Sequence, residues 1–350
     1  MDLAVFWFIL IGVLWTGYLV LEGFDFGVGM LMPIVGKTPK GKRVLLNSIG
    51  PVWDGNEVWL LTAGGATFAA FPEWYATLFS GFYLPLLLIL LALIVRAVAI
   101  EYRSKINDEN WRNRWDLAII ISSWIPSILW GVAFANIVRG VPIDETGTYT
   151  GGFFNLLSPF ALLGGMVTLA IFLSHGSIFL ALKTKGEVMD RAAGWAKKFS
   201  VAAVVVGAVW ALWLQLAYSN NTWTWGAVVL AAAGLIGAVW FSWTGKFGWA
   251  FLANVVAIIG AVTLIFGALF PNVMPSSTNP DFNLLVHAVD GVEGLVASSS
   301  HTTLVVMTWV AGIFTPLVLA YQAWSYWVFK RRLSEEMIPE HNELTFTKNS

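Results

Sequence analysis

The sequence predicts an all-α integral membrane protein with about nine transmembrane helices, arranged as two four-helix bundles plus one additional helix, N-out and C-in. Three observations lead to this prediction. The composition is too apolar for a surface that faces only water. Nine apolar stretches are long enough to cross a bilayer, and the basic residues fall on alternate connections between them.

The composition sets the class of protein. Of the 350 residues, 57% are hydrophobic and 12% are charged, whereas about a quarter of an average soluble domain is charged. The mean hydropathy of +0.72 indicates that lipid solvates much of the surface. The net charge of −1 gives no reason to expect a nucleic-acid partner. Because the chain has no cysteine, disulfides, thiolate metal sites and cysteine catalysis are excluded.

The apolar stretches are expected to be helices. A bilayer core requires about 20 apolar residues in a helix, and lipid leaves unpaired backbone groups unsatisfied in any open structure. The N-terminus has no basic region or cleavage site, so we expect a first span there rather than a signal peptide. The nine predicted spans are 5–32, 46–71, 75–100, 115–138, 153–182, 199–218, 224–243, 249–270 and 302–329.

The basic residues predict the orientation. Eighteen of the 20 lie on every second connection, beginning with the segment 33–45. The opposite connections hold only Arg139, and Arg96 lies within a span. Because cytoplasmic loops are rich in Lys and Arg, the first set is predicted to be cytoplasmic. An odd number of spans follows, with the N-terminus outside.

A weak internal repeat predicts how the spans are grouped. GVAFANI at 131–137 and GALFPNV at 267–273 end the fourth and eighth spans, four helices apart. Duplicated bundles are common in membrane proteins, although chance similarity of small and apolar residues explains the pair equally well. The predicted parts are a first bundle at 1–140, a second bundle at 141–275, an outer loop at 276–301, a ninth helix at 302–330 and a loose cytoplasmic tail at 331–350.

The first three spans carry ionisable residues. Inserting such a residue at membrane depth costs about 2.5–3.5 kcal/mol of free energy, so each is expected to have a structural or functional role. Glu22 and Asp25 share one helix face near the end of the first span, and Asp54 and Glu57 repeat the spacing at the start of the second. Arg96 on the third span reaches a similar level, roughly 10 Å below the cytoplasmic surface at the rise of an α-helix.

These residues leave several functions open. Asp25 and Asp54 can relay protons from the cytoplasm, or an acidic residue can form a structural ion pair with Arg96. The excess of carboxylates over arginine favours proton handling. A secondary transporter, which also uses buried carboxylates, and a purely structural assembly subunit are the alternatives. His175 is expected to be a helix-interface residue, and we expect no haem ligand or metal site in this chain.

Segments across nearly the whole chain resemble subunit II of the cytochrome bd quinol oxidases. The two acidic stretches carry the resemblance most clearly, as EGFDFGVG at 22–29 and NSIGPVWDGNEVW at 47–59. The other matching segments are 79–83, 102–105, 131–134, 274–278 and 307–310.

The resemblance implies a nine-helix subunit of the bacterial cytoplasmic (inner) membrane. It would form a heterodimer with subunit I, with small single-helix subunits as further partners. In the family, subunit I holds the quinol site, haem b and haem d, where oxygen is reduced to water. The complex takes protons from the cytoplasm and so builds a proton motive force by charge separation. Subunit II would ligate no haem and can hold a structural quinone.

The resemblance also implies roles for individual residues. No catalytic residue is expected in this subunit. Asp25 and Asp54 fall on positions of the proton path. As a separate hypothesis, we expect Asp54 to be the inner relay and Asp25 to lie closer to the cytoplasm. Glu22, Glu57 and Arg96 would support this path. Trp59 lies near the region where oxygen enters.

Overall fold

Helix-capping residues mark where the long helices begin. The computed structural model describes residues 2–339. Asp2, Asp108, Ser158 and Ser300 each precede a helix and accept a hydrogen bond from a backbone N–H of its first turn. The helices are α1 (Leu3–Val35), α2 (Pro39–Ile49), α3 (Trp53–Ala70), α4 (Pro72–Gly81), α5 (Tyr83–Tyr102), α6 (Glu109–Arg139), α7 (Pro159–Lys183), α8 (Gly186–Ala217), α9 (Thr224–Trp243), α10 (Phe247–Leu269) and α11 (His301–Val328).

Proline interrupts two of the predicted spans. The segment 46–71 is not one helix, because α2 ends at Ile49, Pro51 follows, and α3 begins at Trp53. The segment 75–100 breaks at Phe82 into α4 and α5. Pro85 has no N–H for a helical bond to the carbonyl of Gly81, and its ring would clash with that carbonyl in a continuous helix. The prediction of single helices over these two segments is therefore wrong.

The all-α membrane fold is confirmed. Within residues 2–339, eight helices are long and apolar enough to cross a membrane, namely α1 and α5 to α11. The predicted span without a counterpart among these eight is 46–71, and its main helix is α3, which has 18 residues and begins with Trp53 and Asp54. It is not among the eight, because its first turns carry Asp54 and Glu57. The count of nine and the orientation stay predictions.

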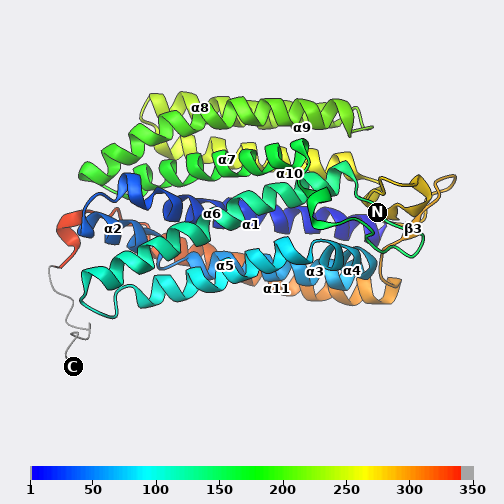
Figure 1. The fold of residues 1–350 in the computed structure, drawn as a ribbon, viewed down its shortest axis with the longest axis horizontal. Helices are drawn as coiled ribbons and strands as arrows, with labels where there is room; N and C mark the ends of the chain where they lie inside the picture. The colour runs from blue at the N-terminus through cyan, green and yellow to red at the C-terminus, as the bar shows by residue number, and fades with distance from the viewer. Residues whose placement is uncertain (1, 340–350) are drawn as a thin grey trace.

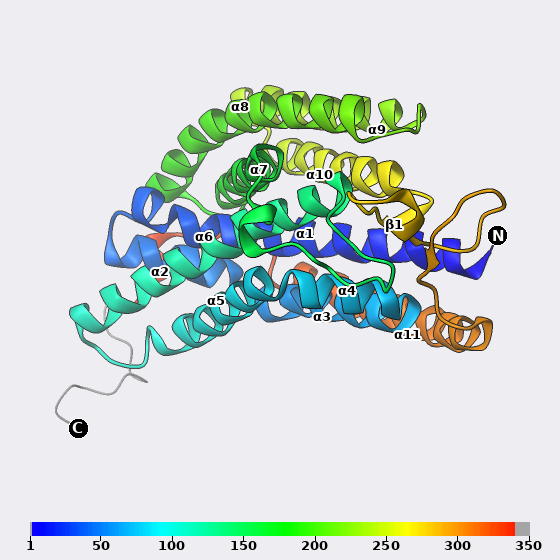
Figure 2. The same ribbon diagram turned by 45° about the vertical axis from the view of Figure 1, so that its right-hand side comes forward.

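The helices form a layered bundle with α1 at its centre (Figure 1). On one side of α1 lie α3 and α5, on the other side lie α7 and α10, and α6 crosses α1 and packs against both α5 and α7. Helices α8 and α9 form the outermost layer beyond α7 and α10, as the turned view also shows (Figure 2). Helix α11 lies along α1 and α3. The boundaries of the two predicted four-helix units stay a prediction.

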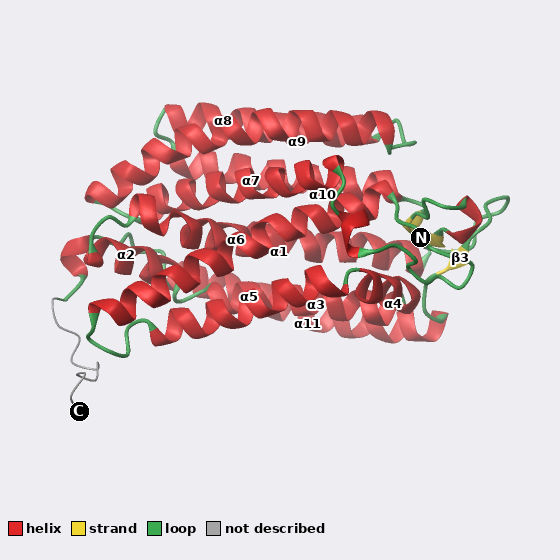
Figure 3. Cartoon of the chain, in the orientation of Figure 1, coloured by secondary structure: helices red, strands yellow, loops and turns green. Residues whose placement is uncertain are grey.

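The two ends of the bundle differ. At one end, beside the N-terminus, a small sheet is built from β1 (Asn272–Met274), β2 (Leu284–Leu285) and β3 (Leu295–Val296), shown in yellow in Figure 3. Strand β2 is central, antiparallel to β1 and parallel to β3. At the opposite end lie α2 and the segment that follows α11 (Figure 1).

The start of the predicted loose tail is in fact fixed to the bundle. The backbone of Leu333 exchanges hydrogen bonds with Lys183 and Lys185 at the end of α7. Glu335 accepts a hydrogen bond from the hydroxyl of Thr38 at 3.0 Å, and Ile338 is buried. The prediction of a loose tail is wrong for residues 331–339, because these contacts satisfy its backbone and bury an apolar side chain. Residues 340–350 of that tail lie outside the described residues.

Candidate functional site

A buried ion pair joins α1 to α5. Arg96 and Glu22 are both fully buried, and Nη1 of Arg96 donates a hydrogen bond to Oε1 of Glu22. The guanidinium also lies over the ring of Phe26, 4.7 Å from its centroid. The carboxyl of Glu57, from α3, approaches the same Nη1 to 4.0 Å. The structure thus brings together Glu22, Glu57 and Arg96, which the sequence analysis placed at a similar depth.

Asp25 lies one helical turn from Glu22 and has a different partner. Its carboxyl is fully buried and accepts a hydrogen bond of 2.7 Å from the amide of Asn56 on α3. The second carboxyl oxygen, Oδ1, has no hydrogen-bond partner among residues 2–339. Asp25 is therefore held in place by a neutral amide rather than by the arginine.

Helix α11 completes this arrangement. The carbonyl oxygen of Asn56 accepts hydrogen bonds from the hydroxyl of Tyr326 at 2.8 Å and from the amide of Gln322 at 3.2 Å. Gln322 in turn accepts a hydrogen bond of 2.8 Å from the indole of Trp59. The sequence analysis missed Asn56, Gln322 and Tyr326. A glutamine in the middle of an otherwise apolar span was the signal that could have identified α11 as part of the site.

Asp54 is separate from the buried cluster. Its side chain is exposed on the first turn of α3, and its carboxyl accepts a hydrogen bond from the backbone of Gly55. It is two residues from Asn56, which contacts Asp25. Of the two aspartates, Asp54 is thus the exposed one and Asp25 the buried one, and their order along a proton path stays a prediction.

The cluster has more acids than bases. Glu22, Glu57 and Asp25 lie around one guanidinium, and Arg96 bonds directly only to Glu22. An uncompensated charge is costly at this depth, and carboxyl groups in such positions are typical of proton relays. The geometry therefore provides carboxyl groups that can take up and release protons, beside an ion pair that holds α1 and α5 together.

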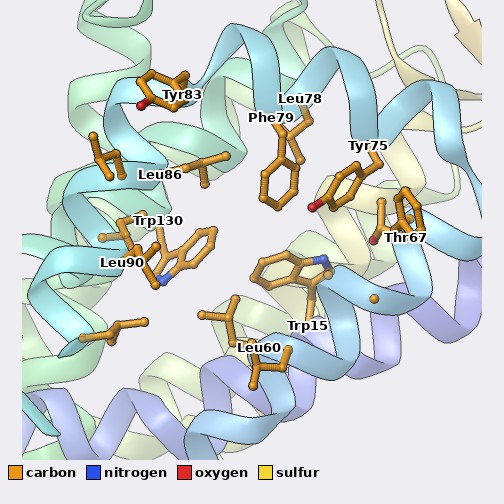
Figure 4. A pocket seen from close by; sticks show the side chains of 17 residues that line it. Trp15, Leu60, Thr67, Tyr75, Leu78, Phe79, Tyr83, Leu86, Leu90 and Trp130 are labelled. Atoms are coloured by element: carbon orange, nitrogen blue, oxygen red, sulfur yellow. The ribbon is translucent and has the colours of Figure 1, made fainter.

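Two apolar cavities flank α3. The first, of about 450 Å³, lies between α1, α3, α4, α5 and α6. Figure 4 shows the aromatic side chains around it, with Trp15 and Trp130 facing Tyr75 and Phe79. The second, of about 460 Å³, is a groove between α1, α3 and α11 and includes Trp59. Both have the size and lining of sites for apolar ligands.

His175 lies on the other side of α1. It is fully buried on α7, and its Nε2 is 3.0 Å from the carbonyl oxygen of Val20. Its ring stacks on Phe251 of α10, with the centroids 4.4 Å apart. The prediction that His175 is a helix-interface residue is confirmed.

Known proteins are similar to this chain in fold and in sequence. The chain has a TM-score of 0.72 to the bd oxidase of Geobacillus thermodenitrificans at 17% identity, covering 94% of this chain and 99% of that one, which shows the fold. It is 36% identical to cytochrome bd-I ubiquinol oxidase subunit 2 of Escherichia coli strain K12, over 96% of both chains. It is 39% identical to cytochrome bd ubiquinol oxidase subunit 2 of Bacillus subtilis, over 94% of this chain and 96% of the relative. Residues 3–329 match the family described as cytochrome bd terminal oxidase subunit II. The chain therefore belongs to the cytochrome bd terminal oxidase subunit II family.

Proposed function

We propose that this chain carries protons from the cytoplasm into a quinol oxidase in which subunit I performs the chemistry. The chain is a multi-pass protein of the bacterial cytoplasmic membrane and a member of a bd oxidase complex. In this proposal the reduction of oxygen to water consumes cytoplasmic protons, whereas the oxidation of quinol releases protons. One observation carries it, namely the cluster of the buried Glu22 and Asp25 and the partly exposed Glu57 around a single arginine.

The exposures of the two aspartates suggest the direction of proton movement. Asp54 is exposed at the start of α3, and Asp25 is fully buried. Because subunit I is expected to cover the exposed face of α3, we place Asp25 closer to the cytoplasm and Asp54 where the path reaches subunit I, in the order that the sequence analysis predicted. Asn56 does not carry the proton itself, because an amide has no suitable acid–base chemistry near neutral pH. Its role is to hold the carboxyl of Asp25.

The partner is expected on the face formed by α3, α5 and α11. Asp54, Val58 and Leu61 follow one exposed stripe of α3, and most side chains of α11 are exposed. A carboxyl group that faces lipid is costly, whereas a protein partner can hydrogen-bond to it. Subunit I would cover this face and receive the protons there. Single-helix subunits remain proposed partners.

Haem b and haem d are assigned to subunit I. When bound there, they supply the electron-transfer and oxygen chemistry of the complex. The buried histidine of this chain does not fit an axial ligand, because one nitrogen of His175 is bonded to the Val20 carbonyl and the ring is stacked on Phe251. The role of this chain is then confined to protons, oxygen access and assembly.

The two apolar cavities suit small apolar molecules. The cavity between Trp15, Trp130, Tyr75 and Phe79 is large enough for the ring of a structural quinone, with about 450 Å³ and flat aromatic walls. The groove beside Trp59 is apolar and lies between α1, α3 and α11, which suits oxygen on its way to subunit I. We assign these two roles accordingly.

The substitution Asp25→Asn tests the proton path. Quinol-driven oxygen consumption of the purified complex should fall by at least about tenfold, while the reduced-minus-oxidised spectrum keeps wild-type haem content. Asp190→Asn, which changes an exposed carboxyl group on α8, is the matched control and should leave turnover unchanged. Wild-type turnover of the Asp25→Asn complex with normal haem content would contradict the proposal. An intact wild-type complex without any haem would instead favour a transporter.

A further inference from the structure

Three fully buried polar residues on α7 and α10 have atoms without a hydrogen-bond partner among residues 2–339. In Asn254 of α10 both amide atoms, Nδ2 and Oδ1, lack a partner. In α7 the same holds for Oγ of Ser174 and Nδ1 of His175. Leaving buried polar groups unpaired is destabilising, and native structures pair nearly all of them with protein or ordered water.

The register of the two antiparallel helices places these residues at one level. Towards the cytoplasmic ends, Ile178 and Ala250 belong to one small apolar cluster. Towards the outer ends, Ile171 and Ile258 line one cavity. Ser174 lies between 171 and 178 on α7, and Asn254 lies midway between 250 and 258 on α10. At spacings of three and four residues, both side chains follow the stripe along which α7 and α10 face each other.

The ring of His175 faces the same junction. It stacks on Phe251, which is one turn from Asn254 on α10. Because the Val20 carbonyl can only accept, Nε2 of His175 carries the hydrogen and donates it to that carbonyl. Nδ1 is then a bare acceptor that requires a donor. The carbonyl oxygen of Asn254 also requires a donor, and its NH₂ group requires an acceptor.

We propose that an internal water site lies between α7 and α10, bound by Asn254, Ser174 and Nδ1 of His175. Water fits this set of groups because it supplies two donors and two acceptors. One molecule can donate to His175 and to the Asn254 carbonyl and accept from the Ser174 hydroxyl. The site carries no ionisable acid, so it is distinct from the cluster around Arg96 and does not depend on the proposed proton path.

A high-resolution cryo-electron microscopy map of the complex tests the proposal directly. A density peak should lie within about 2.6–3.2 Å of both the Asn254 amide and Nδ1 of His175. A map that resolves other buried waters and has no peak there would overturn the proposal. This result decides the question even if a variant fails to assemble.

The substitution Asn254→Leu gives an independent test. A water-bridged amide and an unpaired amide at this position predict shifts of the melting temperature with opposite signs. If water bridges the groups, the loss of the amide leaves the water and His175 less well paired, and the complex should melt about 2–4 °C lower. A higher or unchanged melting temperature would overturn the proposal, since removal of an unpaired amide is not destabilising. Ile258→Leu, on the same stripe, is the control for repacking and should change the melting temperature less.

A double variant separates a shared water from two independent defects. With a bridging water, Ser174→Ala and Asn254→Leu remove parts of one network, so the melting temperature of the double variant should fall by less than the two single shifts together. Strictly additive shifts would count against a shared water molecule.

Discussion

The two sides of α1 hold polar groups of different kinds. Towards α3 and α5, Glu22 and Asp25 belong to a charged cluster in which acids outnumber the single arginine. Towards α7 and α10, the buried polar groups are neutral, namely His175, Ser174 and Asn254. One helix thus separates a region suited to proton exchange from a region in which polar groups only bind neighbours. The difference shows that burial of polar residues alone does not indicate a proton path; a surplus of ionisable groups does.

The substitution Arg96→Gln should have the largest effect, because it removes the positive charge from the charged cluster. Removal of one partner of a buried ion pair leaves the other uncompensated and costs about 3–5 kcal/mol. The complex should therefore assemble poorly, as measured by its yield and melting temperature.

The double variant Glu22→Gln with Arg96→Gln shows what the pair contributes. Because both charges are removed, much of the stability lost in Arg96→Gln should return. Full stability together with full turnover would identify the pair as structural only. Equal instability of the single and double variants would contradict the assignment of Glu22 as the partner of Arg96.

The substitution Asn56→Leu should have the next largest effect. It removes the amide that connects Asp25 to Tyr326 of α11. Hydrogen bonds to charged groups contribute about 1.5–3 kcal/mol each, so the melting temperature should fall and turnover should decrease with it. Val205→Leu, an exposed position on α8, is the control. Wild-type turnover in Asn56→Leu would show that Asp25 does not need this support.

The substitution Gly27→Ala tests the contact between the two sides. A Cβ at Gly27 would lie 2.7 Å from the Cα of Gly176 and also meet the backbone of Phe172, which cannot move as a flexible side chain could. Overpacking of this kind costs about 1–3 kcal/mol, which a thermal unfolding scan of the complex should detect. Gly194→Ala, where a Cβ meets nothing within 4 Å, should be neutral or slightly stabilising. No destabilisation in Gly27→Ala would mean that α1 and α7 separate easily.

The substitution Asp2→Asn should have the smallest effect, because Asp2 lies outside both regions. A backbone hydrogen bond from Ala4 and a hydrogen bond from His287 at 2.6 Å hold the pKa of Asp2 below its ordinary value of 3.8. A lowered folded-state pKa stabilises the fold above the unfolded value, and this stability is lost as the pH falls through the folded value. The contribution of such an exposed pair is below about 1 kcal/mol. Melting temperatures of wild type and Asp2→Asn should therefore differ slightly at pH 7 and converge in strong acid.

Much of this architecture is readable from the sequence, because apolar runs and capping residues dictate helices directly. The runs at 5–32 and 249–270 correspond closely to α1 and α10. The breaks at Pro51 and Phe82 were missed because hydropathy values do not show that a proline, here Pro51 or Pro85, lacks the backbone N–H that a continuous helix requires. The ordered segment 331–339 was missed because its stability comes from backbone hydrogen bonds to Lys183 and Lys185 rather than from apolar length.

The candidate site is readable only in part. Charge at membrane depth identified Glu22, Asp25, Glu57 and Arg96, and all four meet near one level. Spacing alone does not give the rotation of one helix against another, so it could not show that Arg96 pairs with Glu22 while Asp25 bonds to Asn56. Tyr326 and Gln322 come from the last helix, far along the chain, and carry no charge that would have marked them.

Time-resolved proton uptake by the complex in lipid vesicles tests the central claim most directly. A pH-sensitive dye on the cytoplasmic side would follow proton uptake while the haem spectrum follows electron transfer in a single turnover. The account predicts that Asp25→Asn slows proton uptake by at least about tenfold without slowing the first electron transfer. Proton uptake at the wild-type rate in Asp25→Asn, with a normal haem spectrum, would contradict it.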